Sequence, residues 1–362
     1  MVPFAAGEVA VGRPGTRGAA ATGTVVSMRL LVLGGTGFVG GTVVAEAVGR
    51  GWAVTVFNRG RSGAVPDGVS WLSGDRTEPG GLAALSGGAW DLAVDTWAGE
   101  PRAVLAAARA LAGTVGHYGY VSSASVYVHP GPSGATEDAP VVDAVADAGQ
   151  TGYAESKAGA ELAVREVFGD RSLLARAGLI LGPGEDVGRL PWWLRRIERG
   201  GRVLAPGPAD LAVQYIDARD LAAWLLDCGQ NGTGGAFNVV SRSGHATMGE
   251  VLDACVAATG APAELCWTPP EPILAAGVEP WNHLPIWIPP GHEYRWLVEL
   301  DTSRAHAAGL SCRPVAETVT DTWHWLERVG TVPPRAGRAL PFEVGLDPER
   351  EAGLLAGGVA TE

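Results

Sequence analysis

The chain is predicted to fold as an α/β protein, with a doubly wound parallel sheet and a smaller C-terminal region. Short apolar runs alternate with helical patterns over the first half, which favours a parallel sheet covered on both faces. After Ile180 the alternation weakens, and prolines and tryptophans become frequent. The 362 residues, 46% hydrophobic and 18% charged, suffice for one large unit and an appended region.

The first two strands and the helix between them are the clearest elements. Arg29–Leu33 is a short apolar run, followed by a glycine-rich loop and apolar residues at helical spacing. Gly51 stands where a helix C-cap is expected, and the β-branched run Ala53–Phe57 predicts the second strand. Val69–Leu72 is the third strand candidate.

The later elements continue the alternation. Leu92–Val94 predicts a fourth strand, and the helix predicted over Arg102–Leu111 starts directly after Pro101. Tyr118–Ser122 predicts a fifth strand, Gly152–Phe168 a long helix and Leu173–Arg176 a sixth strand. Farther along, Val213–Ile216 and Ala236–Val239 are strand candidates between longer segments. Asp347 is placed to cap a short helix over Pro348–Ala356.

The loop after the first strand has the glycine spacing of a dinucleotide-binding turn. Gly34 permits the tight turn, Gly37 lets the backbone approach a pyrophosphate, and Gly40 allows close packing of helix on strand. The helix N-terminus supplies free N–H groups for the phosphates. We therefore predict a Rossmann-type unit whose loop binds the cofactor through Gly34, Thr36, Gly37, Phe38, Val39 and Gly40.

The end of the second strand bears on the choice of cofactor. NAD enzymes usually place an acid there to bind the ribose hydroxyls, but this chain has Asn58, followed by Arg59 and Arg61. An arginine fork suits a 2′-phosphate, so NADP(H) is favoured and NAD(H) remains an alternative. Asp75, after the third strand, and Thr96, after the fourth, are further candidate cofactor contacts, although a plain turn explains Asp75 equally well.

Ser123, Tyr153 and Lys157 are the candidate catalytic residues. Tyr153 and Lys157 are four residues apart and lie on one face of the predicted helix, and Ser123 ends the fifth strand. A phenol is a poor base at neutral pH, but a nearby ammonium favours its ionised form. Lys157 is the only lysine in the chain. Arginine serves everywhere else, so this position is expected to need a compact ammonium.

These stretches together resemble the extended or atypical short-chain dehydrogenase/reductase family, which includes the NAD-dependent epimerase/dehydratase group. The resemblance covers about residues 28–330 and is carried by Gly34–Gly40, Ser122–Tyr127, Tyr153–Lys157, Arg176–Gly184 and Gln214–Leu221. It implies that Ser123, Tyr153 and Lys157 form a catalytic triad, with Lys157 also holding the nicotinamide ribose. It further implies a homodimer built from the helices at Arg102–Leu111 and Ala154–Phe168, with a monomer left open.

The chain also departs from this family in places. Val128 stands where many members have glycine, and Ala124 and Ser125 replace the Asp-Glu pair of the sugar dehydratases. Dehydration is therefore not expected. The missing acid after the second strand argues against tightly held NAD, as many sugar epimerases use it.

The substrate side is less well defined by the sequence. Trp97 follows the fourth strand and is expected at the mouth of the cleft, and Ser125, His129, Trp192 and His283 are further candidate substrate contacts. The indoles of the C-terminal half either line a pocket or fill the core of the small region. Arg189, Arg195 and Arg196 either hold a diphosphate or form a solvated helix face.

The pattern divides the chain into four ranges. We expect residues 1–27 to be a disordered leader, with a natural start at Met28; 28–180 to bind the dinucleotide; 181–330 to bind mainly the substrate, partly interleaved; and 331–362 to form a tail.

Charge and composition exclude several partners and sites. The net charge of −12 argues against nucleic acid, and no apolar run is long enough to cross a membrane. The four cysteines are scattered without metal-ligand spacing, which indicates no metal and a reducing cytoplasm.

The leading functional hypothesis is an NADP(H)-dependent oxidoreductase that interconverts a carbonyl and a secondary alcohol on a small metabolite. The first alternative is a nucleotide-sugar epimerase, with transient oxidation by bound NAD. The second alternative is a non-catalytic NAD(P)-sensing regulator, which retention of both Tyr153 and Lys157 disfavours.

Overall fold

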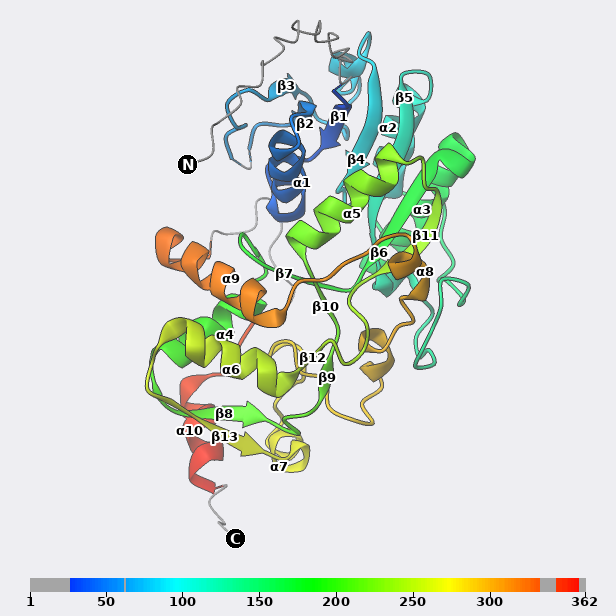
Figure 1. Cartoon of the computed structure of the whole chain (residues 1–362). Coiled ribbons are helices and arrows are strands. Elements are labelled where there is room, and N and C mark those ends of the chain that lie inside the picture. Colours follow the sequence, from blue (N-terminus) through cyan, green and yellow to red (C-terminus); the bar gives the residue numbers. More distant parts are fainter. Residues whose placement is uncertain (1–26, 62, 333–342, 358–362) are drawn as a thin grey trace, which may run out of the picture.

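The computed structural model describes residues 27–61, 63–332 and 343–357 (Figure 1). Its main layer is a seven-stranded sheet of order β11-β6-β5-β4-β1-β2-β3, in which every pairing is parallel. The order reverses between β1 and β4, and such sheets bind ligands at that point, beyond the carboxyl ends of the strands. The predicted doubly wound sheet is confirmed. Its strands are β1 Arg29–Leu33, β2 Ala53–Asn58, β3 Ser70–Ser73, β4 Trp90–Asp95, β5 Val115–Ser123, β6 Ser172–Ala177 and β11 Gly235–Val239.

Two helical layers cover the sheet because successive residues of each strand face opposite sides. In β1, Leu30 and Val32 pack into one apolar cluster, and Leu31 and Leu33 into another, all four fully buried. Helices α1 (Phe38–Gly49) and α5 (Ala218–Gln230) cover the first face, and α2 (Pro101–Leu111) and α3 (Tyr153–Phe168) the second. A strand buried on both faces reads as a continuous apolar run, as this one does.

A smaller region lies beyond the carboxyl ends of the strands, below the sheet in Figure 1. The parallel strands β8 and β13 and the helices α4, α6 and α9 surround its core. Strand β11 and helix α5 return from this part of the sequence to the main layer. The elements are β7 Leu179–Leu181, α4 Arg189–Glu198, β8 Gly201–Pro206, β9 Ala212–Val213, β10 Tyr215–Asp217, β12 Ala246–Thr247, α6 Met248–Thr259, β13 Ala263–Thr268, α7 Pro270–Ala275, α8 Ser303–Ala307, α9 Val315–Val329 and α10 Pro348–Gly357.

Two tryptophans form the centre of this smaller core. Trp193 and Trp287 are fully buried, and their indole N–H groups donate to the carbonyl oxygens of Pro285 and Gly207 at 2.8 and 3.1 Å. A buried indole needs such a partner for its N–H. For these two residues, the structure supports a role in the core and not in lining a pocket.

The C-terminal helix packs onto the small region. Asp347 accepts hydrogen bonds from the backbone N–H groups of Glu349 and Arg350, so the predicted N-cap and helix are confirmed. The buried Glu351 pairs with Arg196 at 2.6 Å, which fastens α10 to α4. The remaining parts of the expected leader and tail, residues 1–26, 333–342 and 358–362, lie outside the described residues.

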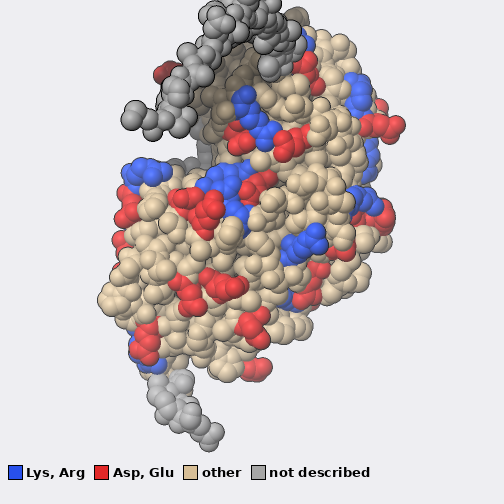
Figure 2. Space-filling model, in the orientation of Figure 1, with Lys and Arg blue, Asp and Glu red and all other residues tan. Residues whose placement is uncertain are grey.

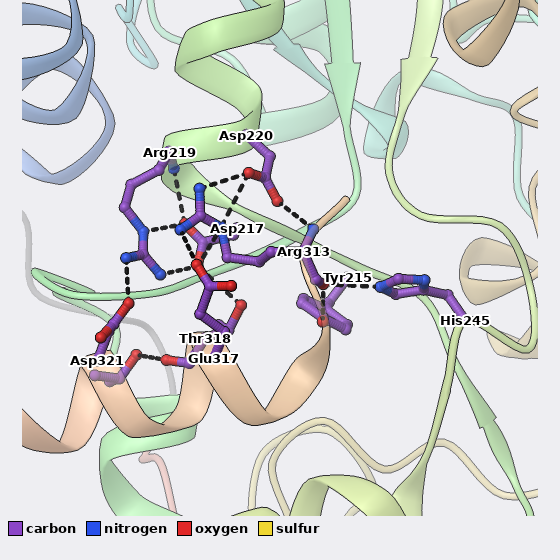
Figure 3. Close-up of polar contacts among 10 residues, drawn as sticks. Tyr215, Asp217, Arg219, Asp220, His245, Arg313, Glu317, Thr318 and Asp321 are labelled. Carbon is purple, nitrogen blue, oxygen red and sulfur yellow. Dashed lines mark hydrogen bonds and ion pairs between the residues drawn. The ribbon is translucent and has the colours of Figure 1, made fainter. Parts of the chain in front are cut away.

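A cluster of ion pairs joins the start of α5 to α9, where basic and acidic side chains meet on the face in Figure 2. Arg219 pairs with Asp217 and Asp321, while Arg313 pairs with Asp220 at 2.7 Å (Figure 3). The hydroxyl of Thr318 donates to Asp217 at 2.8 Å. Burial alone would raise the pKa of Asp217, but hydrogen bonds from Arg219 lower it below its usual value. These contacts fix the small region against the main layer.

Candidate active site

The glycine loop between β1 and α1 has the geometry of a phosphate cradle. Gly34 has φ +102°, and a Cβ there would lie 2.7 Å from the Thr96 hydroxyl. A Cβ on Gly40 would lie 2.6 Å from the carbonyl oxygen of Gly34, so neither position accepts a side chain. Gly37 is the N-cap of α1, makes no side-chain cap and faces open space. The first N–H groups of α1 are thus available to a pyrophosphate, and these residues fit a dinucleotide.

The side chain of Asn58, at the end of β2, is held within its own turn. Its amide donates to the Thr36 hydroxyl at 3.1 Å, and its oxygen accepts from the backbone N–H of Gly60 and from the Trp71 indole. Asn58 therefore braces the loop, and a carboxylate at this position could not donate to Thr36 in the same way. The prediction that Asn58 touches the cofactor is not tested by these contacts.

The two arginines after Asn58 lie near an acid. Arg59 approaches Asp75 at 3.7 Å. The pKa of Asp75 lies below its usual value, chiefly because Thr77 donates to it, with smaller contributions from the charges of Arg59 and Arg61. A 2′-phosphate at this place would therefore meet the Asp75 carboxylate as well as the arginines.

Lys157 is held in a polar cage under the end of the sheet. Its Nζ donates to the carbonyl oxygens of Trp97 at 2.8 Å and Val121 at 2.7 Å, and lies 4.7 Å from the centre of the Tyr120 ring. The residue is only 3% exposed. The Tyr120 hydroxyl donates to the same Trp97 oxygen at 2.9 Å. A compact ammonium satisfies these separate acceptors, whereas the planar fork of arginine does not match them.

Tyr153 is the first residue of α3, and its side chain is 43% exposed. It lies close enough to Tyr120 to raise the pKa of Tyr120, after the larger effects of burial and Asp95. Ser123 ends β5, where its hydroxyl accepts from the Ser125 N–H and donates to the Ser125 hydroxyl, both at 3.1 Å. The helix start and the strand end thus bring an accessible phenol, a buried ammonium and a serine hydroxyl to the edge of the sheet that carries the glycine loop.

A buried ion pair supports this arrangement from below. Arg176 on β6 forms a two-pronged contact with Glu161 on α3, at 2.9 and 2.8 Å, and the Ser122 hydroxyl donates to the same carboxylate at 2.7 Å. Arg176 also donates to Tyr127, whose hydroxyl donates to Asn238 on β11. The network joins the helix of Tyr153 and Lys157 to three strands. No local sequence pattern indicated this network, although Glu161 stands one helical turn after Lys157.

A second buried pair lies under the end of β4. Arg76 pairs with Asp95 at 2.7 Å, and the Tyr118 hydroxyl donates to the same carboxylate. The Arg76 guanidinium also lies 5.0 Å from the centre of the Trp97 ring. Burial, followed by the charge of Asp95, holds the pKa of Tyr118 well above its usual value. This pair fixes the backbone turn whose carbonyl holds Lys157.

Comparison with known families identifies the chain. The model of the "NAD dependent epimerase/dehydratase family" matches residues 30–239, more than half of the chain. The protein belongs to this family. The match covers the glycine loop, the Ser123 strand and the helix with Tyr153 and Lys157. A comparison with curated proteins finds no significant match.

Solved structures with the same fold include nucleotide-sugar epimerases. The Bordetella bronchiseptica enzyme WbmG in complex with NAD and UDP is 19% identical, with a TM-score of 0.61, and the match covers 87% of this chain and 100% of that one. The UDP-glucose 4-epimerase from Thermus thermophilus in complex with NAD is 21% identical, with a TM-score of 0.58 and coverage of 83% and 99%. The UDP-glucose 4-epimerase from Thermotoga maritima with UDP-glucose is 17% identical, with a TM-score of 0.59 and coverage of 84% and 100%. At these identities the likeness establishes the fold.

The predicted substrate residues of this family member are dispersed. Trp97 is partly buried, with its indole N–H donating to Glu100. Ser125 lies beside Ser123. The ring of His129 stacks on that of Tyr294, with 4.0 Å between the ring centres. Its hydrogen-bond partners are Trp296 and Glu293, neither of which belongs to the glycine loop.

The other two candidates lie in the small region. Trp192, in α4, packs edge-on against Trp193. His283 accepts a hydrogen bond from the backbone of Glu279 in the loop before Trp287. Neither contact involves Ser123, Tyr153 or Lys157, so the assignment of these two residues to the substrate stays a prediction.

Two of the three arginines expected near a diphosphate have internal partners. Arg196 is buried against Glu351, and Arg195 pairs with Glu198 and donates to the carbonyl oxygens of Leu326 and Gly330. Arg189 stands at the start of α4, with its guanidinium 4.8 Å from the centre of the Trp281 ring. Arg195 and Arg196 therefore hold parts of the small region together. Neither the expected diphosphate site nor the expected solvated helix face included this role.

Glu185 is a buried carboxyl that no sequence motif pointed to. It accepts hydrogen bonds from the first N–H groups of α4, at Arg189 and Leu190, and is 1% exposed. Burial raises its pKa to about 7, and these hydrogen bonds only partly oppose the effect. The preceding residue, Gly184, lies against Phe38 at the start of α1, so the turn adjoins the cofactor loop.

The described part of the chain carries neither a metal cluster nor a membrane-spanning helix. Within residues 27–61, 63–332 and 343–357, no group of three or more His, Cys, Asp or Glu residues could hold a metal ion. No helix in these ranges is long and apolar enough to span a bilayer.

Proposed function

We propose that the protein is an NAD(H)-dependent epimerase that acts at a hydroxyl-bearing carbon of a sugar-like substrate, with Ser123, Tyr153 and Lys157 as its catalytic residues. The observation that carries the proposal is the pairing of an accessible Tyr153 with a caged Lys157, beside a glycine loop that fits a dinucleotide. Family membership supports an enzyme of this type.

Each residue has a distinct role in the proposed mechanism. A bound nicotinamide would supply the hydride acceptor and donor. The Tyr153 Oη accepts the proton of the substrate hydroxyl and later returns it, and the Lys157 ammonium stabilises the charge on that oxygen. The Ser123 hydroxyl rotates from Ser125 to donate a hydrogen bond to the substrate oxygen. Lys157 would also hold the nicotinamide ribose, and residues Gly34, Thr36, Gly37, Phe38, Val39 and Gly40 would hold the pyrophosphate.

The cofactor assignment departs from the initial preference for NADP(H). Asp75 lies next to Arg59, and an acid close to the arginines opposes a 2′-phosphate. NAD in the fold neighbours WbmG and the Thermus epimerase supports the same assignment. We propose Asp75 and Thr96 as further cofactor contacts, with residues 28–180 binding the cofactor and 181–330 mainly the substrate.

A second candidate function is net reduction of a carbonyl by NADPH. It is favoured by the absence of an acid at the end of β2, where Asn58, Arg59 and Arg61 stand instead. We assign no diphosphate to Arg195 or Arg196, because both have internal partners.

We also propose a homodimer formed through α2 and α3. These helices pack on one face of the sheet, and their outer sides carry Ala106, Ala110 and Leu162 as exposed small or apolar residues. The Arg109–Glu166 pair spans the two helices at the surface.

The test measures epimerisation directly. Purified protein is incubated with UDP-glucose or another UDP-hexose and substoichiometric NAD, and the sugar epimers are quantified by NMR. We expect conversion to equilibrium without net NADH formation, lost by about 10²-fold or more in Tyr153→Phe. Tyr294→Phe is a matched control, because both tyrosines are 43% exposed.

Other outcomes separate the alternatives. Stoichiometric oxidation of NADPH by a carbonyl compound, with no epimer formed, would replace the proposal by the reductase. Failure to bind either dinucleotide in a tryptophan fluorescence titration would refute cofactor use altogether, and with it the epimerase, the reductase and the NAD(P)-sensing regulator.

A further inference from the structure

A pocket lined by none of the glycine-loop or candidate catalytic residues lies in the C-terminal half of the chain. It is a cavity of about 380 Å³ between the loop Arg242–His245 and the turn Leu310–Cys312, with His306 of α8 at its wall. In Figure 1 the chain runs from α8 across to α9 through this turn. None of the residues that line the pocket belongs to the proposed cofactor or catalytic set.

The lining is rich in hydrogen-bond donors. It consists of an arginine, two histidines, two serines, a glycine, a leucine and a cysteine, and contains no acid. The exposed Arg242 guanidinium has neither an ion pair nor a hydrogen bond to any described residue. The hydroxyls of Ser243 and Ser311 are exposed beside it. In a chain with a net charge of −12, a pocket whose lining holds an arginine, two histidines and two hydroxyls but no acid points to an anionic ligand.

His306 provides a second, independent sign of a ligand. Its Nδ1 lies 2.8 Å from the carbonyl oxygen of Leu310 and must donate to it, since a carbonyl only accepts. Its Nε2 is buried and has no hydrogen-bond partner among the described residues. A buried polar atom without a partner is costly. A ligand in the pocket could supply the missing contact.

The electrostatics around His306 favour an anion. Burial lowers the pKa of His306, and the charges of Arg242 and His245 lower it further, while a backbone hydrogen bond to Leu310 opposes them. Cys312 also lines the pocket, and burial raises the pKa of its thiol to about 12, so it stays neutral. An anion among these groups would offset their mutual repulsion and favour a proton on Nε2.

The two acids whose charges act on Cys312 are already paired. Asp217 and Asp220 act electrostatically on Cys312, but Asp217 is bound by Arg219 and Asp220 by Arg313 (Figure 3). The backbone oxygen of Arg313 accepts hydrogen bonds from His245 at 2.9 Å and Tyr215 at 3.2 Å. The same ion-pair cluster thus leaves the charge of Arg242 unneutralised by these acids, and it anchors the backbone next to the pocket.

We propose that this pocket binds a phosphoryl-sized oxyanion, with Arg242 and protonated His306 as charged donors and Ser243 and Ser311 as hydroxyl donors. The site is separate from the proposed catalysis and does not depend on it. Its occupant is either inorganic phosphate or the phosphate group of a small metabolite. Bound at the turn before α9, the anion would further tie α8 to the junction between the two regions.

Calorimetric titration of the full chain with sulfate, phosphate and glucose 1-phosphate tests the proposal. NAD is kept saturating, so that the glycine loop is not the binding site. Removing one charge-assisted donor is expected to weaken binding about ten-fold or more in Arg242→Gln and in His306→Gln. Arg328→Gln is the matched control: it removes the same charge from an exposed arginine on α9 and should leave the affinity unchanged.

Sulfate carries the same charge at pH 6 and pH 8, so it isolates the titration of the protein. Because the anion favours protonated His306, sulfate affinity should fall as the pH rises, by up to about ten-fold per pH unit, and His306→Gln should flatten this dependence. A ten-fold preference for glucose 1-phosphate over phosphate would identify a metabolite, and equal affinities would identify the free ion. Absence of binding at 10 mM anion, or binding that is equal in Arg242→Gln and Arg328→Gln, would overturn the proposal.

Discussion

The buried Glu161–Arg176 pair allows a sharp test of what holds the candidate catalytic helix in place. Helix α3 carries two Arg–Glu contacts of the same length, 2.8 Å, in very different surroundings. The side chains of Glu161 and Arg176 are each 2% exposed, whereas those of Glu166 and Arg109 are 50% and 63% exposed. The substitutions Glu161→Gln and Glu166→Gln therefore remove the same charge from one helix and differ chiefly in burial.

The expected magnitudes follow from burial. Glu161 accepts three hydrogen bonds, two from Arg176 and one from Ser122. Its neutralisation leaves the Arg176 charge buried without a counter-charge, which is expected to lower the free energy of unfolding by about 3–5 kcal/mol. Loss of the exposed Glu166 contact is expected to cost less than about 1 kcal/mol in the unassembled chain, because water screens that pair there. The two variants are therefore compared at a protein concentration at which the chain is monomeric.

Urea unfolding, followed by far-UV circular dichroism at pH 7, measures both costs. Replacing both partners, as in Glu161→Leu with Arg176→Met, should recover most of the stability, since no unpaired charge remains. Equal midpoints for Glu161→Gln and Glu166→Gln would refute the reasoning. So would a double variant that is less stable than Glu161→Gln.

Three further predictions follow from the site. Gly37→Ala should abolish tight dinucleotide binding without loss of stability, because the new Cβ meets no other atom of the protein. Gly40→Ala should reduce both dinucleotide binding and stability, because its Cβ would lie 2.6 Å from the carbonyl oxygen of Gly34. Fluorescence titration measures the binding and thermal unfolding the stability. Lys157→Arg should lower activity as much as Lys157→Met, since neither restores the ammonium in its cage, and wild-type rates for Lys157→Arg would contradict this. Burial raises the pKa of Glu185 from 4.5 to about 7, so the folded state favours the protonated form. The stability that this protonated carboxyl contributes should therefore be lost as the pH rises from about 4.5 to 7. The urea midpoints at pH 5 and pH 7.5 should then differ less in Glu185→Gln than in the wild type.

Local sequence patterns predicted the sheet, three of the four helices that cover it (α1, α2 and α3) and the cofactor loop. Strand β1 reads as an apolar run because the sheet buries both of its faces, and Gly40 is required because helix and strand touch at that point. The spacing of Tyr153 and Lys157 likewise placed both on one helix, and Asp347 marked the start of α10. In each case the determining contacts lie within a few residues or follow from periodicity.

Contacts between distant residues decided the rest. No residue near Arg196 in the sequence indicates that Glu351 pairs with it. The pair between Arg176 on a strand and Glu161 on a helix likewise follows from no local sequence pattern. The sequence by itself determined the strands of the main sheet, three of its covering helices and the residues that carry the proposed chemistry. Only the tertiary structure decided which charges are paired inside the fold and which, like Arg242, stay available to a ligand. The reason is that burial and the choice of partner depend on how distant segments pack, which no periodic pattern in the sequence encodes.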